Sequence, residues 1–501
     1  MHNKTSGTIR KPQSAVRRIL FCLCLGFAVI PVALPGAPTH IPANDPNIQY
    51  IGRFDHSNPV VVTFDWSYSC ISARFQGTSC AVQLGNTSKF FEVYIDGARV
   101  SPIIRTNHGV ESLSVASELP DGVHTVTIYR RDEAGKGVNT FRGFLLDSGK
   151  SLVAPEARPW RKIEFIGDSF TCGYGNEAPY GGSFSYATEN ADLTYAARMA
   201  RHYNADCMMI AWSGKGMVRN YGAAGQTSPD PLPYYYSRIC GTVAADNYAF
   251  AWQPDVVVVA LGINDFSTSP NPTQAQYCGG YSNFVRTIRG HYPNADILCT
   301  YLSSMAGVAS GYIQSVVNAL DDPKVHFARV IYTLTAPADL GAAGHPNASG
   351  HTKIANAFIP VFNSLLGMNW GSAPHGTPLA WLRAHGFTND FAAAEESDPD
   401  DDGVVTWQEY RAGTNPTNAA SVFRLQAVTP TASGLRLTWY GTTNSGVTTP
   451  FQIDRTTNLF PPVWTPIISG IPRAGDGMNA WTDAAPVLNA PNFYRVVIPP
   501  P

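Results

Sequence analysis

The stretch of sequence that decides the fold is RKIEFIGDSFTCGYGNE, residues 161–177. Within it, Ile163–Ile166 is a short apolar run that predicts a buried strand, and Gly167-Asp168-Ser169 follows at once. A serine beside glycine at the carboxyl end of a strand has the placement of a nucleophile. Such a nucleophile needs a base and an oxyanion hole, so we expect partners for Ser169 elsewhere in the chain.

The pattern continues downstream as apolar runs that alternate with helical stretches. The predicted strands are Ile163–Ile166, Cys207–Trp212, Val256–Leu261, Ile297–Leu302 and Val325–Val330. The predicted helices are Leu193–His202, Asn283–His291, Ile313–Leu320 and Thr352–Leu366. This alternation predicts an α/β domain over residues 158–368, with a parallel sheet, helices on both faces and a site at the carboxyl ends of the strands.

Residues 48–150 follow a different pattern of short alternating runs separated by turns. The predicted strands are Val60–Trp66, Ile71–Phe75, Phe90–Ile95, His124–Arg130 and Phe141–Leu146. They predict an N-terminal β-sandwich of jelly-roll type. At the other end, residues 421–501 alternate in the same way and predict a small C-terminal β-sandwich. Carbohydrate adhesion, cell-surface attachment and a role in secretion all remain open for that module.

Between these regions, residues 377–420 contain DPDDDGVVTWQE, residues 398–409, which fits the twelve-residue EF-hand loop. Gly403 stands at position 6, and Thr406 at position 9 would act through a water molecule. A solvated acidic turn would not need glycine at position 6 and glutamate at position 12 together. The loop predicts a structural Ca²⁺ ion whose ligands are Asp398, Asp400, Asp402, the carbonyl of Val404, and Glu409.

The amino-acid composition excludes some classes of function and favours others. The 501 residues carry 35 basic and 37 acidic side chains, for a formal net charge of -2, which excludes a nucleic-acid binder that works through bulk charge. Glycine (44), proline (38) and 11% aromatic residues favour a β-rich, loop-rich extracellular protein.

Residues 1–37 have the features of a bacterial-type export signal: basic residues, the apolar run ILFCLCLGFAVIPVAL, and small residues at Gly36 and Ala37. An uncleaved anchor is the alternative, but Pro31 and Pro35 interrupt a run shorter than the ~20 residues a span needs. We expect a secreted protein, extracellular or periplasmic, with no membrane contact after cleavage. Seven cysteines remain, an odd number, with Cys70–Cys80 and Cys240–Cys278 as candidate pairs.

The partners that a nucleophilic serine needs occur in order along the chain. Gly214 follows the second predicted α/β strand, and its backbone can approach a substrate closely. Asn264 follows the third strand and can donate a hydrogen bond from its amide. His345 comes late in the chain, before the final helix. Each motif alone is weak, but the set favours an acyl-transferring serine enzyme.

Together with WSGKGMVRNYG (212–222), PDVVVVALGINDFS (254–267) and GHPNASGHTKIANAF (344–358), the opening stretch resembles the SGNH (GDSL-type) hydrolases. The chain is more closely similar to carbohydrate esterase family 2, which pairs an N-terminal jelly roll with a flavodoxin-like α/β/α domain, over about residues 48–368. The resemblance implies serine-dependent removal of acetyl groups from plant polysaccharides such as xylan or glucomannan, without a catalytic cofactor. It also implies that Ser169 is the nucleophile, that His345 is the base, and that Gly214 and Asn264 complete an oxyanion hole with the Ser169 N–H.

One departure from the family pattern concerns the base. The family's catalytic histidine usually follows a D-x-H pattern, often with tryptophan in the middle, where this chain has Ala343 and Gly344. The aspartate would orient the imidazole and stabilise its charged form. Three arrangements remain open: a backbone carbonyl orients His345, another carboxylate such as Asp339 takes the place of the missing aspartate, or the site is catalytically impaired. Loss of the tryptophan would also open the pocket to a bulkier acyl group or a different sugar.

Other residues near these motifs have a structural and a functional interpretation. Structural roles are favoured for Asp168, which can satisfy loop N–H groups, for His351 at a helix start, and for Cys172. Sugar contact and a structural role are equally open for Lys215, Arg219, Trp212 and Tyr174.

The prediction is a secreted carbohydrate O-acetyl esterase that acts on acetylated polysaccharide or oligosaccharide through a Ser–His acyl-enzyme mechanism. The alternative from another functional class is a non-catalytic polysaccharide-binding protein on a degenerate SGNH scaffold. An SGNH esterase with a different acyl or sugar substrate is the alternative within enzymes.

Overall fold

The computed structural model describes most of the chain: residues 36–85, 90–100, 104–105, 111–156, 158–159, 161–244, 247–302, 307–366, 371–387, 390–441, 450–474, 477–487 and 489–498. The predicted export signal falls outside these ranges apart from its last two residues. Among the residues so described, no helix combines the length and the apolar character needed to cross a membrane.

The N-terminal region is an antiparallel β domain with two sheets. One sheet contains β1 (Thr39–Pro42), β3 (Val62–Phe64), β5 (Cys80–Gly85), β9 (Glu111–Ala116) and β11 (Asn139–Leu146). The other contains β2 (Ile48–Ile51), β4 (Cys70–Gly77), β6 (Phe90–Ile95), β7 (Ala98–Arg99), β8 (Ile104–Arg105), β10 (Gly122–Arg130) and β12 (Leu152–Val153). Alternate residues of both sheets meet in one apolar core, to which Phe75, Phe91 and Phe144 contribute. All five strands predicted in this region form.

The central region is an α/β domain with five parallel strands in the order β14-β13-β15-β16-β17. The strands are β13 (Arg161–Gly167), β14 (Ala205–Ala211), β15 (Val256–Ala260), β16 (Asp296–Tyr301) and β17 (Val325–Arg329). Each predicted strand is confirmed to within two residues. The parallel sheet has a near-continuous apolar sequence because both of its faces are covered.

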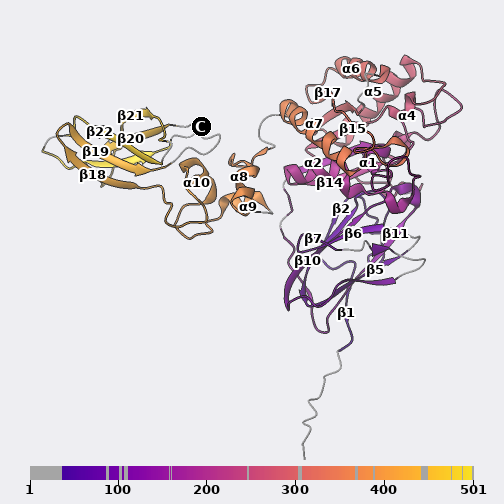
Figure 1. Cartoon of the computed structure of the whole chain (residues 1–501), viewed down its shortest axis with the longest axis horizontal. Coiled ribbons are helices and arrows are strands. Elements are labelled where there is room, and N and C mark those ends of the chain that lie inside the picture. The colour runs from indigo at the N-terminus through magenta and orange to yellow at the C-terminus, as the bar shows by residue number, and fades with distance from the viewer. Residues whose placement is uncertain are drawn as a thin grey trace, which may run out of the picture. The chain divides into compact units, whose positions relative to one another are not determined.

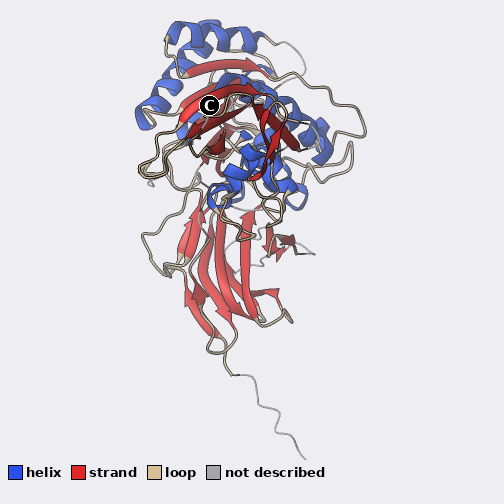
Figure 2. Ribbon diagram, turned by 90° about the vertical axis from the view of Figure 1, so that its left-hand side faces the viewer, coloured by secondary structure: helices blue, strands red, loops and turns tan. Residues whose placement is uncertain are grey.

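Helices cover the sheet on both sides (Figure 2). On one side, α2 (Tyr195–Tyr203) and α7 (Ala348–Leu366) pack with alternate strand residues such as Val256 and Val258. On the other side, α5 (Gln274–His291) and α6 (Val308–Leu320) pack with the intervening residues Val257 and Val259. The domain is therefore a three-layer α/β/α arrangement, and three one-turn helices complete it: α1 (Ser169–Cys172), α3 (Leu232–Tyr235) and α4 (Ile263–Phe266).

Helix α5 begins nine residues before its predicted start. The pair Gly279-Gly280 hides this extension in the sequence because glycine disfavours helix. In the structure, a Cβ atom at Gly280 would lie 2.2 Å from Cγ1 of Val218, so close packing explains that glycine. A capping box between Thr273 and Gln276 starts the helix.

The strand order brings three loops together. The chain runs from β13 to β14 on one side and then crosses to β15 on the other, so the carboxyl ends of these strands are neighbours. In α/β sheets, the crevice at such a reversal is the usual place for a ligand.

From residue 371 on, the described residues form three short helices and two small antiparallel sheets (Figure 1). The helices are α8 (Leu379–Ala384), α9 (Phe391–Glu396) and α10 (Thr406–Ala412). The sheets are β18 (Leu425–Thr431), β19 (Gly434–Tyr440) and β22 (Met478–Asp483), and β21 (Thr465–Ile471), β20 (Phe451–Thr456) and β23 (Phe493–Val497). They share one apolar cluster that includes Trp439 and Phe451.

The two candidate disulfides do not form. Cys70, Cys80 and Cys278 are free thiols, which also removes Cys240 as a partner for Cys278. Burial raises the pKa of Cys80 to about 12, so this thiol is a packed apolar group and not a reactive one.

Candidate active site

Ser169 and His345 meet at the carboxyl end of β13. Ser169 is the first residue of α1, which begins directly after the strand, and it is 8% exposed. Nε2 of His345 lies 2.8 Å from Oγ of Ser169, although the two residues are 176 positions apart in sequence. This is hydrogen-bond distance between a nucleophile and a base.

No carboxylate supports the other ring nitrogen of His345. Among the described residues, its Nδ1 is buried and has no hydrogen-bond partner. The carbonyl groups of Ala342 and Ala343 are the groups that favour its protonation. The carboxylate of Asp339 accepts hydrogen bonds from Nζ of Lys353 (2.6 Å), from the Thr335 N–H (2.7 Å) and from Ser349. Asp339 therefore does not substitute for the missing aspartate.

The pKa of His345 is below its ordinary value because burial disfavours the imidazolium, and the two carbonyl groups only partly offset this. Its imidazole packs against the rings of Tyr174, at 4.5 Å between centroids, and Phe170, at 5.6 Å. A neutral imidazole with a free electron pair on Nε2 suits a general base at neutral pH.

Three hydrogen-bond donors follow the carboxyl ends of the neighbouring strands β13, β14 and β15. The N–H of Ser169 belongs to the first residue of a helix, where no intrahelical acceptor exists. Within the described part of the chain, the N–H of Gly214 donates to nothing, and the residue has φ +77°, which favours glycine. Nδ2 of Asn264 donates to the Lys215 carbonyl at 2.8 Å and lies 3.4 Å from Oδ2 of Asp168, so one of its hydrogens is only weakly engaged.

The loop of residues 213–219 is held by a carboxylate that follows Asn264. Asp265 is fully buried and accepts hydrogen bonds from the N–H groups of Met217 (2.8 Å), Val218 (2.8 Å) and Arg219 (2.9 Å). Burial raises the pKa of Asp265, while these three donors lower it. The carboxylate therefore fixes the loop that carries Gly214.

The same loop is held from the N-terminal β domain, by a residue that the sequence motifs do not reveal. Oε2 of Glu133 accepts a hydrogen bond from the Ser213 N–H at 2.6 Å, and Oε2 of Glu189 accepts one from the Glu133 N–H at 3.1 Å. Burial raises the pKa of Glu133. Glu133 lies 80 residues before Ser213 in the sequence, in another domain, so no local pattern links them.

The remaining candidates divide into structural and peripheral groups. Asp168 caps α1, accepting from the Phe170 N–H at 3.1 Å, and burial raises its pKa to about 7. His351 is buried and accepts from the Tyr195 N–H, and burial lowers its pKa to about 3. Burial raises the pKa of Cys172 well above its usual value, so this thiol stays protonated.

Arg219 and Lys215 differ in their surroundings. Arg219 is fully buried and donates to the carbonyl groups of Gly225 and Ala223, so it shapes its own loop. Nζ of Lys215 is paired with Asp230 at 2.5 Å and lies 4.8 Å from the ring centroid of Tyr235. Lys215 therefore joins the loop of residues 213–219 to a partly exposed cluster that includes Asp230 and Tyr235.

Two pairs of aromatic rings flank the residues of the site. Tyr174 stacks on Phe184 with 4.0 Å between ring centroids, on the His345 side. Trp212 packs against Tyr235 at 4.8 Å, on the side of the oxyanion loop. Both Trp212 and Tyr174 are half-buried, so each combines packing with an accessible face.

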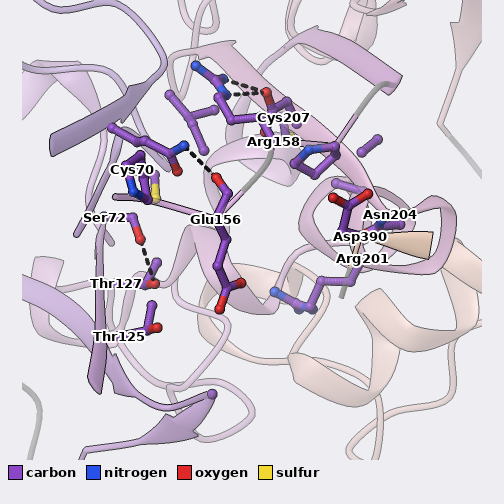
Figure 3. A pocket seen from close by; sticks show the side chains of 18 of the residues that line it. Cys70, Ser72, Thr125, Thr127, Glu156, Arg158, Arg201, Asn204, Cys207 and Asp390 are labelled. Atoms are coloured by element: carbon purple, nitrogen blue, oxygen red, sulfur yellow. Dashed lines mark hydrogen bonds and ion pairs between the residues drawn. The ribbon is translucent and has the colours of Figure 1, made fainter. Parts of the chain in front are cut away.

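A pocket of about 910 Å³ lies elsewhere, beside β4 and β10 (Figure 3). Ser169, His345, Gly214 and Asn264 do not line it. Some of its polar side chains are engaged with one another, as Oγ of Ser72 is with Oγ1 of Thr127 at 3.1 Å. The pocket contributes nothing to the Ser169 site.

Taken together, the site offers a serine hydroxyl, a base and hydrogen-bond donors at the ends of neighbouring strands. Attack on an acyl carbonyl is the chemistry that uses all three.

The families and proteins that resemble this chain act on acyl groups too. Residues 50–155 match the carbohydrate esterase 2 N-terminal family, and residues 165–353 match the GDSL-like lipase/acylhydrolase family. The cellulase/esterase CelE of Acetivibrio thermocellus is 35% identical over 341 residues, which are 65% of this chain and 40% of CelE. The chain thus spans less than half of that relative. An acetylxylan esterase/glucomannan deacetylase of Cellvibrio japonicus is 28% identical over 341 residues, covering 66% of this chain and 92% of the relative.

One solved structure matches about two thirds of this chain and nearly all of its own length. A family two carbohydrate esterase from Clostridium thermocellum, in complex with cellohexaose, is 32% identical with a TM-score of 0.60. The match covers 64% of this chain and 99% of that one. A family two carbohydrate esterase from Cellvibrio japonicus is 26% identical, also with a TM-score of 0.60.

Proposed function

The chain belongs to carbohydrate esterase family 2, and on that basis we propose that it removes acetyl groups from polysaccharide by a serine-dependent mechanism. The observation that carries the proposal is the 2.8 Å contact between Nε2 of His345 and Oγ of Ser169. A protein that only binds polysaccharide has no need of a base on a serine hydroxyl.

In the first half-reaction, Oγ of Ser169 attacks the acetyl carbonyl carbon while Nε2 of His345 takes the hydroxyl proton. The negative charge on the carbonyl oxygen is stabilised by the N–H groups of Ser169 and Gly214 and by Nδ2 of Asn264. The imidazolium then gives its proton to the departing sugar oxygen, which leaves acetyl-Ser169 and a free hydroxyl on the sugar. Water, deprotonated by His345, attacks the acyl-enzyme and releases acetate.

In this proposal, the backbone replaces the usual aspartate behind the base. The carbonyl groups of Ala342 and Ala343 favour the charged form of His345, which is the contribution that an aspartate makes in a triad. A carbonyl dipole stabilises the imidazolium less than a full charge does, so we expect a working dyad with a low histidine pKa.

The polysaccharide class is supported by exposed aromatic rings near the site and by the relatives. Tyr221 is 62% exposed, and its N–H donates to the Gly214 carbonyl at 2.8 Å. Tyr180 is 54% exposed and precedes Gly181, whose N–H donates to the Gly341 carbonyl in the His345 loop. Sugar rings present C–H faces that suit aromatic platforms. Xylan and glucomannan are the substrates that the names of the Cellvibrio japonicus relatives indicate.

Other expectations belong to the same proposal. We take the N-terminal β domain as a jelly roll and the C-terminal sheets as a small sandwich, and we take the chain as exported by its first 37 residues. An exported enzyme would meet polysaccharide outside the cell, where the C-terminal module can attach it to a surface.

The test is acetate release from acetylated xylan and acetylated glucomannan, with wild type and Ser169→Ala side by side. We expect release by the wild type and a loss of about 10⁴-fold or more in the variant. Equal release by the two proteins would refute the role of Ser169.

Cleavage of a small aryl acetate distinguishes the alternatives. Cleavage of that ester without release from either polysaccharide would indicate an esterase with another acyl or sugar substrate. Absence of both activities in the folded protein would favour a non-catalytic polysaccharide-binding function.

A further inference from the structure

The segment between α9 and α10 gathers three acidic side chains. One carboxylate oxygen each from Asp398, Asp400 and Asp402 lies within 4.8 Å of the others. Like charges this close repel one another unless a cation lies between them. Three acidic side chains alone do not make a metal site, so a fourth side chain is needed.

That side chain is Glu409, in the first turn of α10. The residue is fully buried, and both of its carboxylate oxygens lack a hydrogen-bond partner among the described residues. The N–H and Oγ1 of Thr406, the first residue of α10, donate to the Ser397 carbonyl, so the helical turn that carries Glu409 lies beside the start of the acidic loop. A buried carboxylate without a partner is unfavourable for folding, and a bound cation would offset this cost.

Further unengaged oxygens belong to the same group. Both carboxylate oxygens of Asp400 and Oδ2 of Asp402 are buried without partners. The carbonyl of Val404 accepts no hydrogen bond from any described residue. Carboxylate and carbonyl oxygens are the ligands that Ca²⁺ prefers.

The backbone supports the same arrangement. Gly403 has φ +90°, a conformation that favours glycine at the sharp turn of the loop. Both N–H and Oγ1 of Thr406 donate to the Ser397 carbonyl, at 2.8 and 2.9 Å, and so close the loop. Asp401, by contrast, is exposed and outside the cluster.

From this geometry we propose that the segment binds one Ca²⁺ ion through Asp398, Asp400, Asp402, the Val404 carbonyl and both carboxylate oxygens of Glu409. These groups supply six oxygens, and water completes the shell. The many protein oxygens favour Ca²⁺ over Mg²⁺, which keeps several of its waters and demands a smaller octahedral site. The ion offsets part of the negative charge of the acidic group and fixes α10 to α9, independently of the esterase site.

Terbium luminescence on the full chain tests the proposal, because Trp407 lies within the loop and can transfer energy to a bound Tb³⁺ ion. We expect Tb³⁺ emission that Ca²⁺ displaces at about 10⁻⁴–10⁻³ M, the range of extracellular loops, and that Mg²⁺ does not displace there. Trp407→Phe should remove most of the emission, while calorimetry with Ca²⁺ alone still detects binding.

Three matched variants assign the ligands. Glu409→Gln and Asp400→Asn should each weaken Ca²⁺ binding by about tenfold or more, while Asp401→Asn should change it by less than about twofold. Thermal unfolding serves as the second readout: Ca²⁺ should raise the melting temperature of wild type and Asp401→Asn, and should leave that of Glu409→Gln unchanged. Equal weakening by all three variants, displacement by Mg²⁺ as readily as by Ca²⁺, or no binding at 10⁻² M would overturn the proposal.

Discussion

The imidazole of His345 has Ser169 on one ring nitrogen, and in the described part of the chain the carbonyl groups of Ala342 and Ala343 are the groups that favour its protonation. Burial is the largest influence on its pKa and lowers it. A base that is neutral at low pH stays active there, because only the neutral form accepts the serine proton. The absent aspartate therefore changes the pH range of the proposed reaction as well as its rate.

Replacing Ala343 tests this reasoning at the level of one residue. Ala343 has φ +49°, which aspartate and asparagine adopt more readily than alanine does. In wild type, the acid limb of kcat/KM should have its midpoint below 6.5, the ordinary pKa of histidine. Ala343→Asp should raise that midpoint by about one unit or more, since a nearby carboxylate stabilises the imidazolium.

The control is Ala343→Asn, which has the same shape and no charge. Its pH profile for aryl acetate hydrolysis should coincide with that of wild type. A midpoint that moves equally in both variants, or in neither, would contradict the proposed role of position 343.

At the scale of elements, the loop of residues 213–219 is held at both ends by buried carboxylates. Asp265 holds its far end through three N–H groups, and Glu133 holds its start through one. A preorganised oxyanion hole needs such support, because donors that move lose most of their effect in the transition state.

Glu133 is accordingly expected to act as a positioning residue. Glu133→Ala leaves the buried Ser213 N–H without an acceptor and should lower kcat by about tenfold to hundredfold with little change in KM. Glu133→Gln retains an acceptor oxygen and should recover most of the rate. Steady-state kinetics on an aryl acetate measure both effects, and a loss confined to protein stability, with kcat intact, would refute this role.

The comparison between sequence and structure is clearest for these same elements. The strand ends that carry Ser169, Gly214 and Asn264 follow from apolar runs and from the rule that sites lie at carboxyl ends of parallel strands. Glu133 could not be predicted, because its partner lies 80 residues away in a different domain. In the sequence, residue type alone made Asp339 a candidate. The hydrogen bond that its carboxylate accepts from Lys353 also depends on three-dimensional packing.

At the scale of the whole molecule, the N-terminal β domain shares buried contacts with the α/β domain. Trp66 and Ala134 belong to the same apolar cluster as the inner residues of β13 and β15. Arg53 and Glu164 form an ion pair at 3.0 Å with both side chains fully buried, and Glu164 lies within β13. The nucleophile's strand thus depends on a charge from the other domain.

Breaking that pair should be costly. Arg53→Met leaves the Glu164 carboxylate buried without its counter-charge, and we expect a loss of about 3–5 kcal/mol in unfolding free energy. The double variant with Glu164→Gln should recover much of this loss. Urea unfolding of the three proteins tests the expectation, which fails if the double variant is as unstable as Arg53→Met.

The most direct test of the proposed mechanism is covalent labelling with a serine-directed fluorophosphonate followed by peptide mass spectrometry. Phosphonylation transfers the reagent's phosphorus to the activated serine oxygen and releases fluoride. We predict one label, on the peptide that contains Ser169, and a labelling rate that falls by about 10³-fold or more in His345→Ala. An unlabelled but folded wild type, or a label on Ser169 that forms equally fast without His345, would contradict the Ser169–His345 dyad.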